Sequence, residues 1–194
     1  FGTTVVFPNA VAKGRAHGVD VRVEVPRWGG WSGYASGTLS RVVQTGPVTG
    51  GVFLEDEVAD LGPGVEFVPD HDQRVALAGG ASWEHPRSGV TVSAALRYES
   101  GTPISRDDED EAALLDRPGA ELVDFARGRV KPRTLASLNA VMPVLRSARG
   151  QALLRVSVLN LFDRRYAYNF GNPFSGTHFG AGRAVSISLQ ITVR

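Results

Sequence analysis

The strongest constraint on the fold is a strict two-residue alternation at the end of the chain. In residues 185–194 the apolar residues Val185, Ile187, Leu189, Ile191 and Val193 are separated by polar ones. Residues 18–25 repeat the pattern with valine at every second position. Successive side chains of a strand point to opposite faces, so this period predicts two strands, each with one apolar and one polar face.

Further strands are predicted along the whole chain. Alternation is clear in residues 90–98 and 154–158. It is blurred in residues 31–43, 73–83 and 134–145, which are rich in Gly, Ala and Ser, so their register is not set by the pattern. Residues 3–7 carry β-branched side chains and form the remnant of a further strand. The expected total is about eight strands.

The connections between these strands alternate in length. Residues 26–30, 85–89 and 146–150 form short turns, whereas residues 44–72, 101–133 and 161–182 are long polar loops. In an up-and-down antiparallel sheet, this alternation puts all long loops at one end. Transmembrane β-barrels have this asymmetry, and their strands of about 9–11 residues exceed the usual length of about 5–6.

Aromatic residues are expected near both ends of the strands. Strand centres hold Val, Ile, Leu, Ala and Gly, which favours two membrane-interface girdles over the aromatic edges of a soluble core. The residues concerned are Trp28, Trp31 and Trp83 beside the short turns, and Tyr98, Phe162, Tyr166, Tyr168 and Phe170 at the opposite ends.

Charged residues within the strands indicate which face meets lipid. An arginine on the lipid face costs about 2–4 kcal/mol at the bilayer midplane. Arg22, Arg97 and Arg155 are therefore expected to point inward, and Asp20 and Glu24 share the phase of Arg22. A charged, hydrated interior follows.

Candidate catalytic and metal-binding residues are few. The acidic run Asp107, Asp108, Glu109, Asp110, Glu111 does not match a calcium-binding EF-hand loop, because position six is Ala112. We interpret this run, and Glu55 to Glu57, as a solvated loop or as one bridged to lipopolysaccharide by divalent ions. His17, His71, His85 and His178 show no metal-binding spacing, and His85 with Ser88 lacks an oxyanion arrangement. No enzyme activity, metal or cofactor is expected.

Composition excludes several other classes. Lys and Arg total 21 against 20 for Asp and Glu, too balanced for nucleic-acid binding. The chain has no cysteine, and no apolar run is long enough for a transmembrane helix. It begins with Phe1 and lacks a leader, so we expect an excised or truncated piece.

Phrases near the strand ends resemble a known family. Asn160, Leu161, Phe162 and Asp163, followed by Tyr166, residues 174–183 and a final strand, resemble the C-terminal end of a TonB-dependent outer-membrane receptor. Ser100, Gly101, Thr102 and Pro103, and the segment from Gly18, are similar to two earlier phrases of that family. Because Asn and Asp form local turns with the backbone, we expect the Asn160 phrase to be architectural. One departure is the terminus: the family usually ends in an aromatic that contributes to the assembly signal, whereas this chain ends at Arg194.

The resemblance implies an all-β fold, with residues 1–194 forming the C-terminal portion of an antiparallel, up-and-down transmembrane β-barrel. It also implies partners: outer-membrane lipid and lipopolysaccharide, a plug domain, the energising inner-membrane complex and the barrel-assembly machinery. The plug domain and signal peptide are not in this sequence. The ligand would be a ferric siderophore, cobalamin, haem or an oligosaccharide. Candidate ligand-loop residues are Asp107, Asp108, Glu109, Asp110, Glu111, Phe170, Phe174, His178 and Phe179, and Asp20, Arg22, Glu24, Arg97 and Arg155 would face the plug.

Two alternatives remain open at the level of sequence. One is a complete small barrel or passive pore of eight strands, which would require hydrogen bonds between the first and last strands. The other is a soluble β-sandwich that binds carbohydrate, in which a second sheet would bury the face formed by Val19, Val21, Val23 and Val25.

Overall fold

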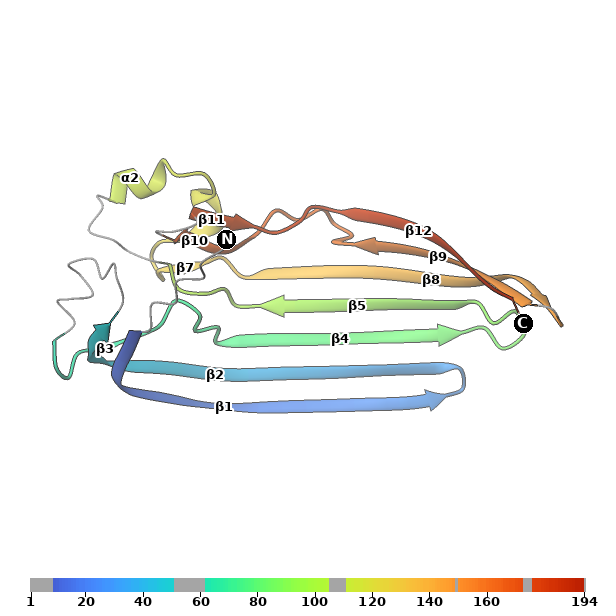
Figure 1. Cartoon of the computed structure of the whole chain (residues 1–194), viewed down its shortest axis with the longest axis horizontal. Coiled ribbons are helices and arrows are strands. Elements are labelled where there is room, and N and C mark those ends of the chain that lie inside the picture. The colour runs from blue at the N-terminus through green and yellow to red at the C-terminus, as the bar shows by residue number, and fades with distance from the viewer. Residues whose placement is uncertain (1–8, 51–61, 105–110, 149, 173–175, 194) are drawn as a thin grey trace, which may run out of the picture.

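The chain forms one large antiparallel sheet. A computed structural model describes residues 9–50, 62–104, 111–148, 150–172 and 176–193. Within these ranges an eight-stranded sheet has each long strand beside the next long strand of the chain, which confirms an antiparallel, mostly β architecture (Figure 1). The order is β1 (Asn9–Trp28), β2 (Trp31–Gly50), β4 (Val75–Glu84), β5 (Thr91–Glu99), β8 (Arg133–Ser147), β9 (Gly150–Leu159) and β12 (Ala184–Val193), with β3 (Glu66–Phe67) added to β2.

Short and long connections lie at opposite ends of the sheet, as predicted. The turns β1–β2, β4–β5 and β8–β9 lie together at the right of Figure 1. Gly29 and Gly30 in the first turn have φ of 58° and 87°, a conformation that glycine adopts at no steric cost and that suits a two-residue hairpin. The long connections lie at the left, called the loop end below.

The long connections, predicted as polar loops, also contain short helices and hairpins. They contain α2 (Glu111–Leu115), the 3₁₀ turn η1 (Ala120–Leu122), and the hairpins β6 (Val123–Asp124) with β7 (Arg129–Val130) and β10 (Ala167–Asn172) with β11 (Gly176–Phe179). We call these elements the loop cap. The apolar residues of the loop cap show no regular spacing in the sequence, because they belong to short elements that pack on each other. The buried apolar cluster of the described residues lies here: Ile104, Leu114, Val123, Val130, Ala167 and Phe170.

Strands β1 and β2 are longer than the sequence indicated. Each spans 20 residues, and their register is continuous from Lys13 opposite Thr45 to Val25 opposite Gly33. Residues 10–17 lack apolar alternation, so backbone pairing with β2 holds this part of β1. The predicted remnant at residues 3–7 lies outside the described residues.

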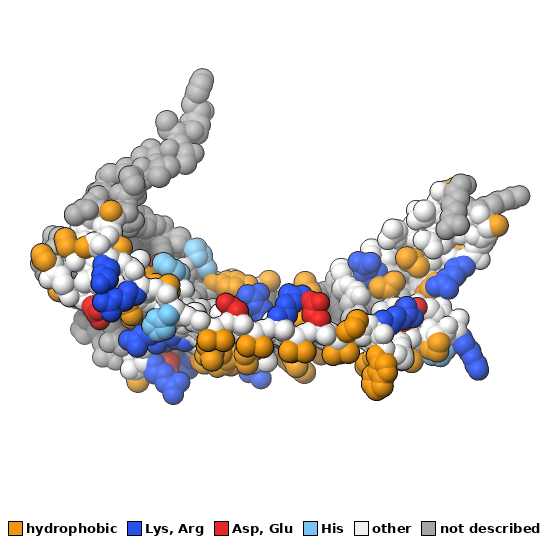
Figure 2. Space-filling model, turned by 90° about the horizontal axis from the view of Figure 1, so that it is seen from below, with side chains coloured by type: hydrophobic (Ala, Val, Ile, Leu, Met, Phe, Trp, Pro, Cys, Tyr) orange, Lys and Arg blue, Asp and Glu red, His pale blue; other side chains and the backbone are white. Residues whose placement is uncertain are grey.

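Strand registers divide the sheet into an apolar and a polar face. One row joins Val23, Ala35, Gly79, Leu96 and Ala136 across five strands. Other large residues of this apolar face are Val19, Val21 and Val25 in β1, Leu39 in β2, Leu77 in β4, Leu138 in β8, Val156 and Val158 in β9, and Val185, Ile187, Leu189, Ile191 and Val193 in β12. Figure 2 looks onto the β1 edge: hydrophobic side chains line the convex lower side, and charged ones gather on the hollow upper side.

The apolar face has no partner within the described residues. Ile187 is 70% exposed, and the four valines of β1 are about half exposed or more. No second sheet covers these valines in the described part of the chain, so the structure does not supply the burial that a β-sandwich requires.

The sheet is open. Strands β1 and β12 lie at its two edges and are not hydrogen-bonded to each other in the described residues, so the closure required of a complete eight-stranded barrel is absent there. Among the same residues, no helix has the length and apolar character needed to span a bilayer.

Candidate functional site

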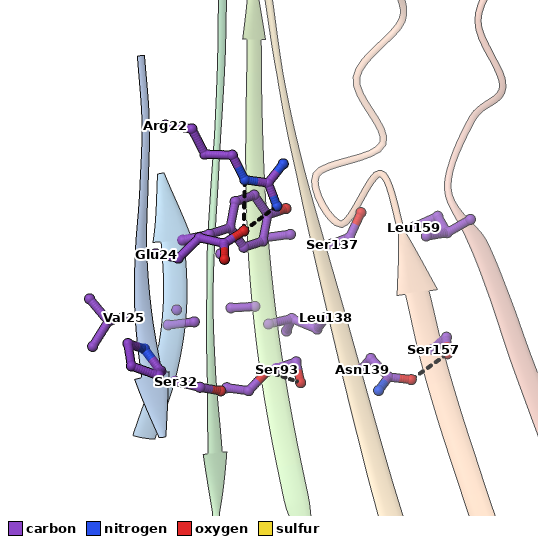
Figure 3. Close-up of a pocket in the computed structure, with 18 residues that line it drawn as sticks. Arg22, Glu24, Val25, Ser32, Ser93, Ser137, Leu138, Asn139, Ser157 and Leu159 are labelled. Carbon is purple, nitrogen blue, oxygen red and sulfur yellow. Dashed lines mark hydrogen bonds and ion pairs between the residues drawn. The ribbon is translucent and has the colours of Figure 1, made fainter. Parts of the chain in front are cut away.

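The polar face carries a hollow bounded by six strands. Its volume is about 700 Å³, and residues from β1, β2, β4, β5, β8 and β9 line it (Figure 3). Its lining mixes small apolar residues with polar side chains, among them Arg22, Glu24, Ser93, Asn139 and Ser157 (Figure 3). The hollow therefore offers charges and hydroxyl groups to a hydrated partner.

The charged residues predicted to point inward share this face. Arg22 and Arg97 lie in one row through Ser36 and Ala78, and Arg155 lies opposite Ser188 on the same face. Arg22 forms an ion pair with Glu24 at 2.5 Å. Both groups are well exposed, so this pair adds little stability and remains available to a partner.

Asp20 accepts a hydrogen bond of 2.5 Å from the Thr38 hydroxyl on the neighbouring strand. The guanidinium of Arg22 lies 5.9 Å from the centre of the Tyr34 ring. Asp20, Arg22 and Glu24 therefore form one charged strip along β1, at the edge of the hollow.

A row of small polar side chains crosses the hollow and was not anticipated. It runs through Ser32, Ser82, Ser93, Asn139, Ser157 and Ser186, which face each other in consecutive strand pairs. The Ser82 and Ser93 hydroxyls are 2.7 Å apart, and Ser157 donates a 2.8 Å hydrogen bond to Asn139. Serine is common in sequences, and only the registers reveal that these residues align.

A buried aspartate joins the sheet to the loop cap. The Asp72 side chain is fully buried and accepts hydrogen bonds from the Val42 N–H at 2.8 Å, from Arg74, and from Arg129 at 2.5 Å. Arg129 also donates to the carbonyls of Asp72 and Gly101. Burial acts to raise the pKa of Asp72, but the hydrogen bonds outweigh it and hold that pKa below its ordinary value of 3.8. Nothing in the sequence around Asp72 indicated this role, because its partners Val42 and Arg129 are distant in the chain.

A second buried ionic group links β5, β8 and β10. Glu99 forms ion pairs with Arg97 and Arg133, and Arg133 donates a 2.7 Å hydrogen bond to the Ala167 carbonyl. The Arg133 guanidinium lies 4.6 Å and 5.4 Å from the ring centres of Tyr168 and Tyr166. Both ionic groups thus lie where strands of the sheet enter the loop cap.

Tyr166 is buried in this region. Burial, together with the hydrogen bond between the Tyr166 and Tyr168 hydroxyls, which are 3.2 Å apart, raises the pKa of Tyr166 to about 12. Tyr166 and Phe170 are therefore cap residues, and the prediction that they belong to an interface girdle was wrong. Their burial results from cap packing, whereas Phe162 and Tyr168 remain exposed.

The phrases that carried the family resemblance make structural contacts. Ser100 accepts a hydrogen bond from the Val75 N–H, and Thr102 donates to the Tyr168 carbonyl at 2.9 Å. Gly101 has a φ of 83° and packs against the Val130 carbonyl so closely that a Cβ would overlap it. Pro103 forms a β-bridge with Arg129. This phrase connects the end of β5 to the loop cap.

The second phrase closes the turn after β9. Asn160 donates to the carbonyls of Arg164 and Ala181, and accepts from the Arg164 N–H. Asp163 accepts from the Arg183 N–H at 2.7 Å. Both side chains therefore hydrogen-bond to the backbone, as expected. Leu161 donates its N–H to the Ala136 carbonyl.

The predicted ligand-loop residues that the structure describes differ in exposure. Phe170 is 1% exposed within the cap core and cannot meet a ligand in this conformation, whereas His178 and Phe179 are exposed on β11. Glu111 begins α2. Asp107, Asp108, Glu109, Asp110, Phe174 and the run from Glu55 to Glu57 lie outside the described residues.

Histidines do not form a metal site or a triad in the described part of the chain. His71 is 3.0 Å from Asp70 on an exposed loop, and no three His, Cys, Asp or Glu side chains of the described residues are placed to hold a metal. Ser88 contacts His85 at 3.0 Å within the exposed β4–β5 turn. That contact fixes the turn, because the Ser88 N–H also points to the same His85 nitrogen.

Compared with known protein families and with curated proteins, the sequence matches none.

Proposed function

We propose that this chain is the C-terminal portion of a TonB-dependent outer-membrane receptor, which takes up a large, scarce ligand by energised transport. The observation that carries the proposal is the apolar face, which exposes large hydrophobic side chains on β1, β2, β4, β5, β8 and β12 and carries no charged residue from Val19 to Val25 or along β12. The sequence phrases around Ser100 and Asn160 support it.

Lipid is the environment that suits this face. Fully burying one Val, Leu or Ile side chain stabilises a protein by about 1.5–3 kcal/mol, and monomeric soluble proteins rarely expose apolar patches larger than a few hundred Å². Facing lipid, the same side chains are in an apolar medium, while the polar face meets water.

The open edges indicate that other strands complete the barrel. The backbone groups of an edge strand have no partner in lipid, at a cost of several kcal/mol for each unsatisfied group. Barrels of about 22 strands enclose a lumen that is plugged. In this proposal the edges at β1 and β12 pair with further strands, and the hollow with Arg22 and Glu24 faces the plug domain.

The remaining partners follow from the same proposal. The loop cap stands at the external end and contributes to capture of a ferric siderophore, cobalamin, haem or oligosaccharide. The barrel-assembly machinery inserts the barrel, and the inner-membrane complex supplies energy through the plug. The protein carries out no covalent reaction and resides in the bacterial outer membrane.

The test is energised uptake by cells. A strain lacking the gene should lose uptake of one radiolabelled ligand from these four classes, and a protonophore should abolish that uptake in the parent strain. Uptake that survives the protonophore would indicate a passive pore instead. If the protein is absent from the outer-membrane fraction, the proposal is wrong.

A further inference from the structure

Tyr34 forms an aromatic platform on the floor of the polar hollow. Its ring extends from β2 to β4, where its Cε1 atom lies 2.9 Å from the position that a Gly80 Cβ would occupy. Because Gly80 has no side chain, the ring lies against the sheet at this point. Tyr34 lines the hollow and is 42% exposed, so part of its ring surface is open to a ligand there.

An ion pair flanks this platform. The Arg22 guanidinium lies 5.9 Å from the centre of the Tyr34 ring, and Glu24 is directly opposite Tyr34 on β1. Arg22 and Glu24 pair with each other, as the dashed lines in Figure 3 show, and both side chains are well exposed. A guanidinium beside a carboxylate offers several donors and acceptors, which suits the neighbouring hydroxyl groups of a sugar ring.

Small hydroxyl and amide groups lie one row from the platform. Ser82 is two residues from Gly80 along β4, which places the two rows about 7 Å apart. The Ser82 and Ser93 hydroxyls are 2.7 Å apart, and the Asn139 amide oxygen accepts a hydrogen bond from Ser157. No hydrogen bond from the Asn139 amide nitrogen is recorded among the described residues, so that group is available to a ligand.

The described lining of the hollow has no net charge. Arg22 and Glu24 are its charged residues, and their signs are opposite. In the next row toward the turns, Glu84 and Arg155 are again one anion and one cation. An anionic ferric chelate would require unpaired cations for charge complementarity, whereas a neutral oligosaccharide requires none. Tyr34 is the one aromatic residue of the described lining, which is too small a surface for a macrocycle such as haem or cobalamin.

The hollow lies away from the loop cap. Ser32 and Tyr34, which line it, closely follow the turn at Gly29 and Gly30. This part of the wall is therefore separate from the predicted ligand loops. A ligand captured at the loop end would reach it only later, on its way toward the turn end.

We propose that the hollow is a transit subsite for a neutral oligosaccharide. One sugar ring stacks its C–H face on Tyr34, and its hydroxyl groups bond to the Arg22–Glu24 pair on one side and to the row containing Asn139 on the other. The volume of about 700 Å³ is within the usual range of ligand pockets. The inference rests on the proposed function, in which the ligand passes along this wall, and it selects one of the four ligand classes.

Four variants test the subsite. Tyr34→Ala removes the platform and should weaken sugar binding about tenfold, the contribution of a good aromatic contact. Tyr34→Phe keeps the ring and should bind like the parent. Asn139→Ala removes the amide and should weaken binding about fivefold, as loss of one hydrogen bond does. Tyr98→Ala is the matched control, because it removes a tyrosine from the apolar face of β5.

The experiment uses the protein as its gene encodes it, purified in a zwitterionic detergent without a sugar headgroup. Isothermal titration calorimetry measures binding of maltohexaose, xylohexaose and mannohexaose, and of a ferric tris-catecholate and haem for comparison. We expect at least one hexaose to bind, with the losses in Tyr34→Ala and Asn139→Ala given above and none in Tyr34→Phe or Tyr98→Ala. Thermal unfolding checks that each variant is folded, and Asn139→Ala decides the matter if Tyr34→Ala is not.

Three results overturn the inference. They are binding of none of the hexaoses, equal sugar binding by Tyr34→Ala and Tyr98→Ala, and a loss in Tyr34→Ala confined to the ferric tris-catecholate or haem. Cell fractionation and uptake test the proposed function separately. Protonophore-sensitive uptake without Tyr34-dependent sugar binding refutes only the inference. Tyr34-dependent sugar binding by a protein absent from the outer membrane refutes the proposed function and leaves the sugar site.

Discussion

The Asp72 carboxylate should be the most stabilising single ionic group between the sheet and the loop cap. Its side chain is fully buried. It contacts the Val42 N–H of β2, Arg74 immediately before β4, and Arg129 of β7. Asp70, two residues earlier, supplies a matched control because its side chain is 69% exposed and its recorded contact among the described residues is with exposed His71. We compare Asp72→Ala with Asp70→Ala.

The expected cost of Asp72→Ala is about 3 kcal/mol. The substitution leaves the Val42 N–H without its acceptor and leaves the Arg129 charge, 18% exposed, without a counter-ion. Breaking a buried ion pair in this way costs about 3–5 kcal/mol. We take the lower end because Arg74 is 37% exposed and can turn toward water. Asp70→Ala should change stability by less than about 0.5 kcal/mol, as surface substitutions do.

Hydrogen exchange of the loop cap is the appropriate assay, because the cap can open without unfolding of the sheet. The amides of Val130 and Lys131, which donate to Thr102 and Leu122, report cap closure. Their protection should fall about a hundredfold in Asp72→Ala, corresponding to about 3 kcal/mol, and should be unchanged in Asp70→Ala. Equal protection in the two variants would refute the assigned role of Asp72.

The pH dependence follows from the lowered pKa of Asp72, which lies at the loop end outside the strands that we propose to cross lipid. An acid whose pKa is lower in the folded state stabilises that state above its unfolded pKa. The stabilisation should therefore be complete above the ordinary value of 3.8 and should disappear as the pH falls below it. Cap protection in Asp72→Ala should lack this acid-dependent loss.

Three further predictions concern other parts of the chain. Gly180→Ala should destabilise the cap by about 1–3 kcal/mol, because a Cβ at this position overlaps the Tyr166 ring. Gly14→Ala should leave stability unchanged, because the space around Gly14 is open. Thermal unfolding of both variants checks this prediction. Absorbance titration should show a tyrosine ionising at about pH 12 that is absent from Tyr166→Phe, and the stability that this neutral phenol contributes below pH 10 should be lost as the pH rises through 12. The isolated 194-residue chain should give no sharp, reversible heat-modifiable band in detergent, because both sheet edges are open; such a band would refute the need for further strands.

The sheet was predictable from sequence because one of its faces is apolar and the other is polar. Alternation at Val19 to Val25 and Val185 to Val193 predicted strands there, and the alternation of turn and loop lengths predicted their antiparallel order. Register in the Gly- and Ala-rich strands was not predictable. Small residues satisfy either face, so only pairing with neighbours such as Gly79 with Leu96 sets it.

The loop cap was not predictable for a different reason. Its buried residues, such as Ile104, Val130 and Phe170, come from short elements far apart in the chain, so no local period marks them. The charges of the cap give no local signal either, because Asp72 meets Arg129 only after folding. By contrast, the position of Arg22 on the polar face of β1 followed directly from its place between Val21 and Val23 in the sequence.

The central claim is that the apolar face lies in lipid and the opposite face in water, and cysteine accessibility tests it most directly. The chain has no native cysteine, so single cysteines at Ile187, Ser188, Leu189 and Gln190 can each carry a fluorophore without background. In the protein embedded in vesicles, a lipid-soluble quencher should act on positions 187 and 189, and a water-soluble quencher on 188 and 190. Water-soluble quenching of all four positions, or protection of 187 and 189 from both quenchers, would contradict the account.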